Sequence, residues 1–176
     1  MQKLYTLLPH SVFIKMATMP HLTTKGADGK RRPINSDSAR EILERGRWAG
    51  EPACPKCNAA KPIYKRHLLG YFRCPKCKLD FTVRTGTVMA RSHVALDKWV
   101  YAAYIWMHDF HQAPRTIGRF SSARLSRQIE VTQKTAWLLQ QRLQEALHDH
   151  ESRFLLEVGE YLYRRAYAKK QQGGSP

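Results

Sequence analysis

Two CxxC pairs constrain the fold of this chain more than any other feature of its sequence. Cys54-Pro-Lys-Cys57 and Cys74-Pro-Lys-Cys77 are copies of one tetrapeptide, separated by sixteen residues, and they use every cysteine of the 176-residue chain. This spacing is typical of structural zinc sites, in which each CxxC turn supplies two thiolates to a tetrahedral ion. Four thiolates leave no position for a bound water. We therefore expect one structural Zn2+ and no chemistry at the metal.

The same four cysteines would serve differently in a redox or a disulfide-bonded protein. Redox CxxC pairs need a thioredoxin-like βαβ unit, whereas residues 63–66 and 70–73 have the pattern of two short strands joined by a turn. Disulfides are typical of secreted chains, and residues 1–17 lack the apolar core and cleavage site of a signal peptide. We therefore favour a zinc ribbon in the reducing cytoplasm. No run of eighteen apolar residues predicts a membrane span.

The ribbon has too few apolar residues to fold by burial alone, so metal ligation must supply part of its stability. A short helix capped by Asp37 or Ser38 and running through Arg45 should precede it, with Trp48 closing the helix against the ribbon. The apolar residues available to cover the ribbon are Ile63, Tyr64, Leu68, Leu69, Phe72, Phe81 and Val83.

The charge of the chain narrows the class of partner. Thirty Lys and Arg against fourteen Asp and Glu give a formal net charge of +16. Such an excess favours a polyanionic partner, and nucleic acid is the default expectation. Arg73 and Arg84 are candidates for phosphate contacts on the strand side of the ribbon. A basic surface that only keeps the protein in solution is the alternative.

A second module should begin near Ser92 with an apolar helix over about 94–109. A short helix from Ser121 or Ser122 to Ile129 follows, then a break at 130–132, then a helix over 133–148 with Thr132 as its N-cap. A short helix, a tight turn and a longer helix form a helix-turn-helix pattern, although an ordinary three-helix bundle with a polar face has the same spacing. The inward face would comprise Ala136, Leu139, Leu143, Ala146 and Leu147, and the candidate DNA contacts on the outer face are Gln133, Lys134, Trp137, Gln141 and Arg142.

These patterns predict a small α+β protein, in which a metal-stapled β zinc ribbon is followed by an all-α helix-turn-helix bundle. We divide the chain into a flexible basic arm (1–37), the ribbon with its leading helix (38–91), the helix-turn-helix bundle (92–150) and a C-terminal tail (151–176). The tail begins apolar, so it should either pack on the bundle or promote self-association.

Several segments in fixed order resemble the front half of bacterial insertion-sequence transposases with an N-terminal zinc ribbon. After the CPxC pairs come Phe81-Thr82-Val83-Arg84-Thr85-Gly86-Thr87 and then Val131-Thr132-Gln133-Lys134-Thr135-Ala136-Trp137, and the resemblance spans roughly residues 39–148. It implies that the ribbon and helix-turn-helix bind double-stranded DNA at the terminal repeats of a transposon, in the bacterial cytoplasm and associated with the nucleoid. It also implies a following RNase H-like domain whose acidic residues cut and join DNA.

The chain departs from that family at 157–160. Such transposases have a strand resembling Glu-Val-Asp-Glu, whose aspartate is the first catalytic carboxylate, whereas this chain has Glu157-Val158-Gly159-Glu160 followed by sixteen residues. An RNase H-like sheet needs on the order of a hundred residues, so we expect the catalytic domain to be missing and the chain not to be an enzyme. Glu130, where the family commonly has glycine, is a lesser departure.

The sequence therefore predicts a DNA-binding fragment of a transposase that recognises terminal repeats without catalysing strand transfer, with possible partners in an intact transposase or a second copy of itself. Two alternatives stay open. The same modules could form a transcription regulator acting at a promoter, or a protein-interaction adaptor whose positive charge is incidental.

Overall fold

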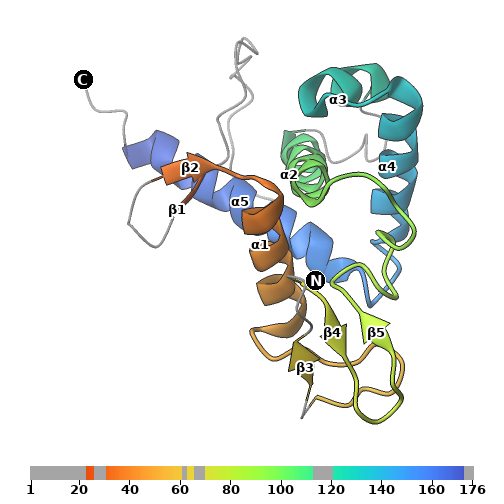
Figure 1. Ribbon diagram of the computed structural model, residues 1–176. Helices are drawn as coiled ribbons and strands as arrows, with labels where there is room; N and C mark the ends of the chain where they lie inside the picture. Colours follow the sequence, from red (N-terminus) through yellow and green to blue (C-terminus); the bar gives the residue numbers. More distant parts are fainter. Residues whose placement is uncertain (1–22, 26–30, 61–62, 66–69, 113–120, 173–176) are drawn as a thin grey trace.

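The computed structural model describes residues 23–25, 31–60, 63–65, 70–112 and 121–172. Within these ranges the chain has two small antiparallel sheets and five helices (Figure 1), which confirms the predicted α+β class. The strands are β1 (Thr23–Lys25), β2 (Arg31–Pro33), β3 (Tyr64–Lys65), β4 (Phe72–Arg73) and β5 (Asp80–Phe81). The helices are α1 (Ser36–Trp48), α2 (Leu96–Gln112), α3 (Ser122–Ile129), α4 (Gln133–Glu145) and α5 (Arg153–Gln172).

Helix α1 begins with a capping box built on Asn35. The Asn35 side chain accepts a hydrogen bond from the Ser38 N–H at 2.9 Å, and the Ser38 hydroxyl accepts one from the Asn35 N–H at 2.9 Å. The predicted cap at Asp37 or Ser38 is therefore wrong, because Ser38 serves as the third residue of the box. The helix also runs beyond Arg45 and ends at Trp48.

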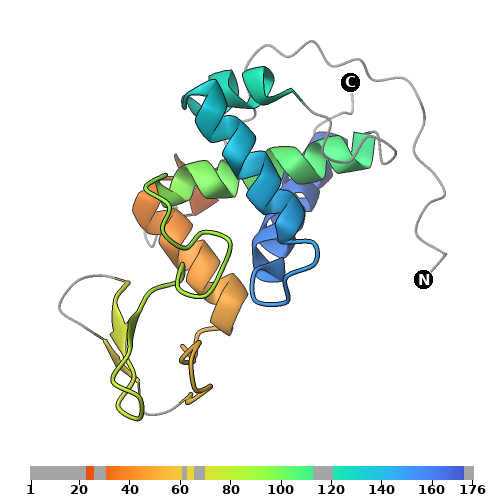
Figure 2. The ribbon, with the colours of Figure 1, turned by 90° about the vertical axis from the view of Figure 1, so that its right-hand side faces the viewer.

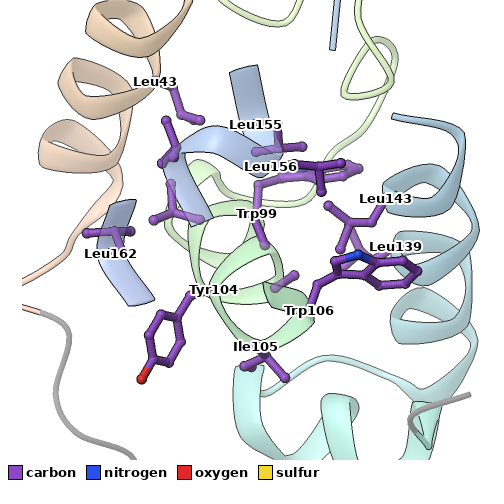
Figure 3. Close-up of a cluster of buried hydrophobic side chains, with 14 of the residues drawn as sticks. Leu43, Trp99, Tyr104, Ile105, Trp106, Leu139, Leu143, Leu155, Leu156 and Leu162 are labelled. Atoms are coloured by element: carbon purple, nitrogen blue, oxygen red, sulfur yellow. The ribbon is translucent and has the colours of Figure 1, made fainter. Parts of the chain in front are cut away.

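Helices α1, α2 and α5 share one apolar core, against which α3 and α4 also pack (Figure 3). The apolar start of the tail lies in α5, which packs along α2 and α1, so this segment is repacked on the bundle. The buried side chains of the helices include Ala39, Leu43, Trp99, Val100, Ala103, Ile105, Trp106, Leu125, Ile129, Ala136, Leu139, Leu143, Leu155, Leu156 and Leu162.

Two glycines allow α5 to lie close to its neighbours. A Cβ at Gly159 would lie 2.5 Å from the carbonyl oxygen of Ala103, so the backbones of α5 and α2 touch there. A Cβ at Gly46 would lie 2.7 Å from Cγ2 of Val158, at the contact of α1 with α5. At Gly159 glycine is a requirement of helix packing, since a Cβ would meet backbone atoms that cannot move aside, whereas at Gly46 the neighbouring atom belongs to a side chain.

The ribbon lies at one end of the molecule and is joined to the helices through α1 and the loop before α2 (Figure 2). Its sheet has the order β3-β4-β5, with Phe72 paired to Phe81 across the last two strands. The strands β3 and β4 agree with the two predicted for the ribbon. Of the apolar residues expected to cover it, Phe72 and Phe81 are buried, Tyr64 is exposed, and Leu68 and Leu69 lie outside the described residues.

The N-terminal region has more structure than the sequence indicates. Strands β1 and β2 pair as a hairpin within the segment expected to be a basic arm, and Ile34 is buried in the helical core. Helix α1 also contributes to that core rather than to the ribbon alone. The arm residues 1–22 and 26–30 lie outside the described ranges, and the domain boundaries at 37, 91 and 150 stay predictions.

Across the described ranges, no helix combines the length and the apolar character needed to cross a membrane.

Candidate metal centre and nucleic-acid interface

The four cysteines converge on one point of the ribbon. Their sulfurs all lie within 4.8 Å of one another. The Cys54 and Cys77 sulfurs are 3.5 Å apart, and those of Cys57 and Cys74 are 3.6 Å apart. A tetrahedral ion with Zn–S bonds of about 2.3 Å needs sulfurs about 3.8 Å apart. The donor set and its spacing therefore fit one zinc ion, as the sequence predicts.

Two matching turns bring the sulfurs together. The N–H of Asn58 donates to the carbonyl of Cys54 at 2.9 Å, and the N–H of Lys78 donates to the carbonyl of Cys74 at 2.9 Å. Asn58 and Lys78 both have left-handed backbones, with φ of 54° and 61°. The repeated tetrapeptide thus gives a repeated knuckle, in which each CxxC turn presents two sulfurs to the same side.

The backbone around the second knuckle favours the thiolate form of Cys74. The N–H of Cys77 lowers the pKa of the Cys74 thiol to about 6, against the opposing effect of burial, and the N–H of Lys76 adds to the lowering. A thiolate is the form that binds zinc. The turn geometry therefore prepares this sulfur for a metal ion.

An aromatic cluster joins the ribbon to α1. Trp48 meets Phe72 edge-on with ring centroids 5.3 Å apart, and meets Phe81 in the same way at 5.9 Å. The two phenylalanines stack at 5.6 Å. The expected role of Trp48, closing the helix against the ribbon, is confirmed by these contacts.

Arg47 binds the ribbon to the helices by hydrogen bonds. Its side chain is 5% exposed, and its Nη1 donates to the carbonyls of Val83 and Thr85 at 2.9 and 2.8 Å. Its Nη2 lies 3.4 Å from a carboxylate oxygen of Glu151, just before α5. Burial lowers the pKa of the Arg47 guanidinium, and Glu151 opposes this shift. The sequence contains no local signal for this role, because the partners are 36 to 104 residues away.

Helices α2, α3 and α4 form the three-helix arrangement predicted for the second module. The α3–α4 turn places Glu130 in the left-handed region, with φ of 53°, and its carboxylate lies 3.5 Å from the Lys98 ammonium. The Thr132 hydroxyl accepts a hydrogen bond from the Thr135 N–H at 3.2 Å, so Thr132 is the N-cap as expected. The tight turn forms although Glu130 lacks the freedom of glycine.

Helix α4 presents two different faces. Ala136, Leu139, Leu143 and Ala146 are buried against the core, as the periodicity predicts. Four of the five outer-face candidates are exposed: Gln133, Lys134, Trp137 and Gln141. Trp137 is 52% exposed and Leu138, beside it, is 46% exposed. Large apolar side chains left in solvent on a polar helix face are typical of a binding surface.

The three arginines predicted to contact DNA form bonds within the protein. Arg142 donates to the carbonyls of Val88 and Ala90, and Arg84 donates to those of two further loop residues. Both side chains are half-buried. Arg73 pairs with the Asp80 carboxylate at 2.9 Å across β4 and β5. Their guanidinium groups already have partners, which charge and position in the sequence do not reveal.

The acidic residues near the C-terminal end do not gather into a metal site. Residues 157–160 lie in α5 and not in a strand. Glu160 bonds the His111 ring at 2.6 Å and the Arg164 guanidinium at 2.5 Å, whereas Glu157 is exposed. Bonds from His111 and Arg164 lower the pKa of Glu160 against the effect of its burial. Among the described residues, the cysteine cluster is the group of His, Cys, Asp and Glu side chains able to hold a metal ion.

Fold and site together define a zinc-ribbon protein with a helix-turn-helix module. Residues 34–80 match the family described as the transposase zinc-ribbon domain, so this part of the chain is such a domain. The resemblance stated from the sequence is confirmed.

An uncharacterized protein in transposable element ISH50 of Halobacterium salinarum is 30% identical to this chain over 121 residues. The alignment covers 65% of this chain and 36% of the relative, so the chain spans about a third of the length of the relative it matches. No solved structure matches the chain. These findings support a transposon-related protein.

Proposed function

We propose that this protein binds double-stranded DNA by placing α4 in the major groove, and that zinc holds the ribbon beside it. The observation that carries the proposal is the exposed face of α4, on which Gln133, Lys134, Trp137 and Gln141 stand free of the core. The net charge of +16 and the transposase zinc-ribbon match favour a nucleic-acid partner.

The dimensions of α4 suit this role. Its thirteen residues give a length of about 20 Å, and a major groove about 12 Å wide admits a single helix. The first residues of the second helix of a helix-turn-helix reach base edges. Gln133 can bond adenine through its amide, and Lys134 can contact guanine or a phosphate. Trp137, one turn further, offers an apolar surface to thymine methyl groups.

The relation to a transposable-element protein suggests the terminal repeats of an element as the target. We propose that the chain binds these ends without cutting them, since its C-terminal acidic residues lie on or before a helix and have separate partners. Association with the nucleoid would follow from such binding. Metal-dependent nicking of terminal-repeat DNA by the purified chain would contradict the non-catalytic part of this proposal.

The test of sequence reading is a selection of bound sequences from random duplex DNA, with the zinc-loaded protein and with a Gln133→Ala variant. We expect the wild type to enrich one motif. The variant should lose preference at one position, at a cost of about 1–3 kcal/mol. Lys78→Ala, on the exposed end of a ribbon knuckle, is the control and should enrich the wild-type motif. Enrichment of no motif by the wild type would reject sequence-specific recognition.

Salt dependence tests the phosphate contacts separately. If six or more phosphates are contacted, affinity should fall by a factor on the order of a thousand over a fourfold rise in salt. Fluorescence anisotropy with a labelled duplex measures this directly. Binding that is unchanged by salt, or absent at low salt, would favour the adaptor alternative, in which the partner is a polypeptide.

Burial of apolar side chains on α5 limits the surface of the tail through which the protein could self-associate. Phe154, Leu155, Leu156, Leu162 and Tyr163 are buried against the bundle and are not available to a second copy. Tyr161 stays 57% exposed on α5. Self-association, with a second copy or with an intact transposase, therefore stays a prediction for sedimentation to check. Footprints confined to promoters would favour the regulator alternative.

A further inference from the structure

The loop between the ribbon and α2 is bonded from two sides by the guanidinium groups of two half-buried arginines. From α4, Arg142 Nη1 donates to the carbonyls of Val88 and Ala90 at 3.0 and 3.1 Å. From the loop's own beginning, Arg84 donates to the carbonyls of Ser92 and Val94 at 3.1 and 2.7 Å. Alternate carbonyls along 88–94 are thus held by two arginines.

The remaining bonds of this loop tighten it further. The N–H of Ala90 donates to the carbonyl of Thr87 at 2.9 Å, and the N–H of Ser92 donates to that of Met89 at 3.3 Å. The N–H of Val88 donates to the hydroxyl of Ser152, which is fully buried just before α5. Because its backbone groups are bonded to three separate parts of the fold, the loop cannot move independently of α4.

Arg91, in this loop, presents a positively charged side chain to solvent. Arg91 is exposed, and its backbone lies in the left-handed region with φ of 57°. That conformation costs free energy for any residue with a Cβ, and glycine adopts it freely. Within the part of the chain that the structure describes, the Arg91 side chain forms no hydrogen bond or ion pair. Arginine therefore adds nothing to folding at a position where glycine would be better.

Arg91 lies next to a residue that is bonded to α4. Its neighbour Ala90 is bonded to Arg142, and Leu138 and Gln141, both exposed, lie one turn before and beside Arg142 on the same helix. The loop runs from the ribbon to α2 and contacts α4 through the bonds of Arg142 to Val88 and Ala90. A cation held here stands at the flank of the helix that would enter the groove.

We propose that Arg91 contacts a DNA phosphate beside the groove that α4 enters, and that Arg142 and Arg84 are positioning residues for the loop that carries it. This inference rests on the proposed function. A guanidinium bonds a phosphate through two parallel N–H groups, which fixes orientation as well as supplying charge. Glycine would form this turn without strain, and backbone strain is typical of sites where the side chain has a function.

Arg91→Gly separates binding from folding, because it removes the cation and relieves the backbone. The matched control is Lys78→Gly, which removes an exposed cation from a backbone with φ of 61° in the ribbon. Both variants should keep or raise the Tm. Arg91→Gly should reduce the slope of log affinity against log salt by about one, measured by anisotropy on a random duplex, while Lys78→Gly leaves the slope unchanged. Arg91→Lys should restore most of it.

Arg142→Ala tests the positioning role. In a chain that keeps Arg91, Arg142→Ala should reduce the slope of log affinity against log salt by as much as Arg91→Gly does. The double variant should reduce this slope no further than either single variant. A purely structural role would lower the Tm without this non-additivity. Equal slopes for Arg91→Gly and wild type, or equal losses for Arg91→Gly and Lys78→Gly, would overturn the inference. Failure of the wild type to bind any duplex would instead reject the proposed function.

Discussion

Replacing Cys57 by serine, or stripping zinc with a chelator, is expected to unfold the ribbon and leave the helices folded. The ribbon's own buried cluster consists of Cys54, Phe72, Cys74 and Phe81, so two of its four members are metal ligands. Without the ion, two aromatic rings and Trp48 cannot offset the entropy of ordering the chain from 53 to 88. Structural zinc contributes apparent binding free energies of about 10–16 kcal/mol to such modules.

The helical core should survive because the helices supply nearly all of its buried side chains, to which the segment after β5 adds Val83 and Met89. Its buried side chains come from all of the described helices. Amide spectra should therefore show loss of dispersion for the ribbon and for the loop that Arg84 bonds, with the far-ultraviolet helical signal nearly unchanged. Asn58→Gly, beside the same knuckle, is the control and should keep the ribbon folded, since φ there is 54°. Ribbon resonances that persist in the zinc-free protein would contradict the expected dependence.

Loss of the ribbon should also weaken DNA binding indirectly. Arg84 belongs to the segment after β5 and bonds the loop that carries Arg91. Arg47 holds the same segment through Val83 and Thr85. An unfolded ribbon would release these bonds and loosen the loop beside α4. We therefore expect the metal to affect DNA binding through the backbone carbonyls that Arg47 and Arg84 bond, without contacting DNA itself.

Local patterns predict most of this architecture because their causes are local. The CxxC spacing predicts the four-sulfur cluster, and the Thr132 cap and the apolar period of α4 predict the helix-turn-helix. The misassigned cap of α1 shows the limit of such reasoning, since Asn35, Asp37 and Ser38 are all good capping residues. The choice among them depends on where the chain enters the helix.

Long-range bonds explain what sequence patterns do not predict. Arg84 and Arg142 look like surface cations in a basic chain, yet their partners are loop carbonyls, in the case of Arg142 more than fifty residues away. Arg91 does not belong to any helical or strand pattern in the sequence. Its left-handed backbone conformation, on which the inference rests, is not predicted by the residue type, because arginine rarely adopts it. Net charge indicates the class of partner, but only the fold shows which arginine and lysine side chains are exposed and able to contact that partner.

Gly159→Asp is expected to destabilise the protein severely, although it gives residues 157–160 the acidic pattern of a catalytic strand. Any Cβ at this position would lie 2.5 Å from the carbonyl oxygen and 2.7 Å from the carbonyl carbon of Ala103. Backbone atoms cannot rotate aside as a side chain can. The carboxylate would also be placed against a carbonyl dipole with little access to water. We expect a loss of at least about 3 kcal/mol in the free energy of unfolding.

Two alanine variants separate steric overlap from charge. Gly159→Ala should destabilise by about 1–3 kcal/mol despite the better helix propensity of alanine. Gly46→Ala meets only Cγ2 of Val158, an atom that can move, and should cost less. Urea denaturation followed by circular dichroism measures all three. Equal stability of Gly159→Asp and wild type would mean that α5 does not lie against α2. In that case residues 157–160 would be free to form a strand, and their carboxylates could serve catalysis.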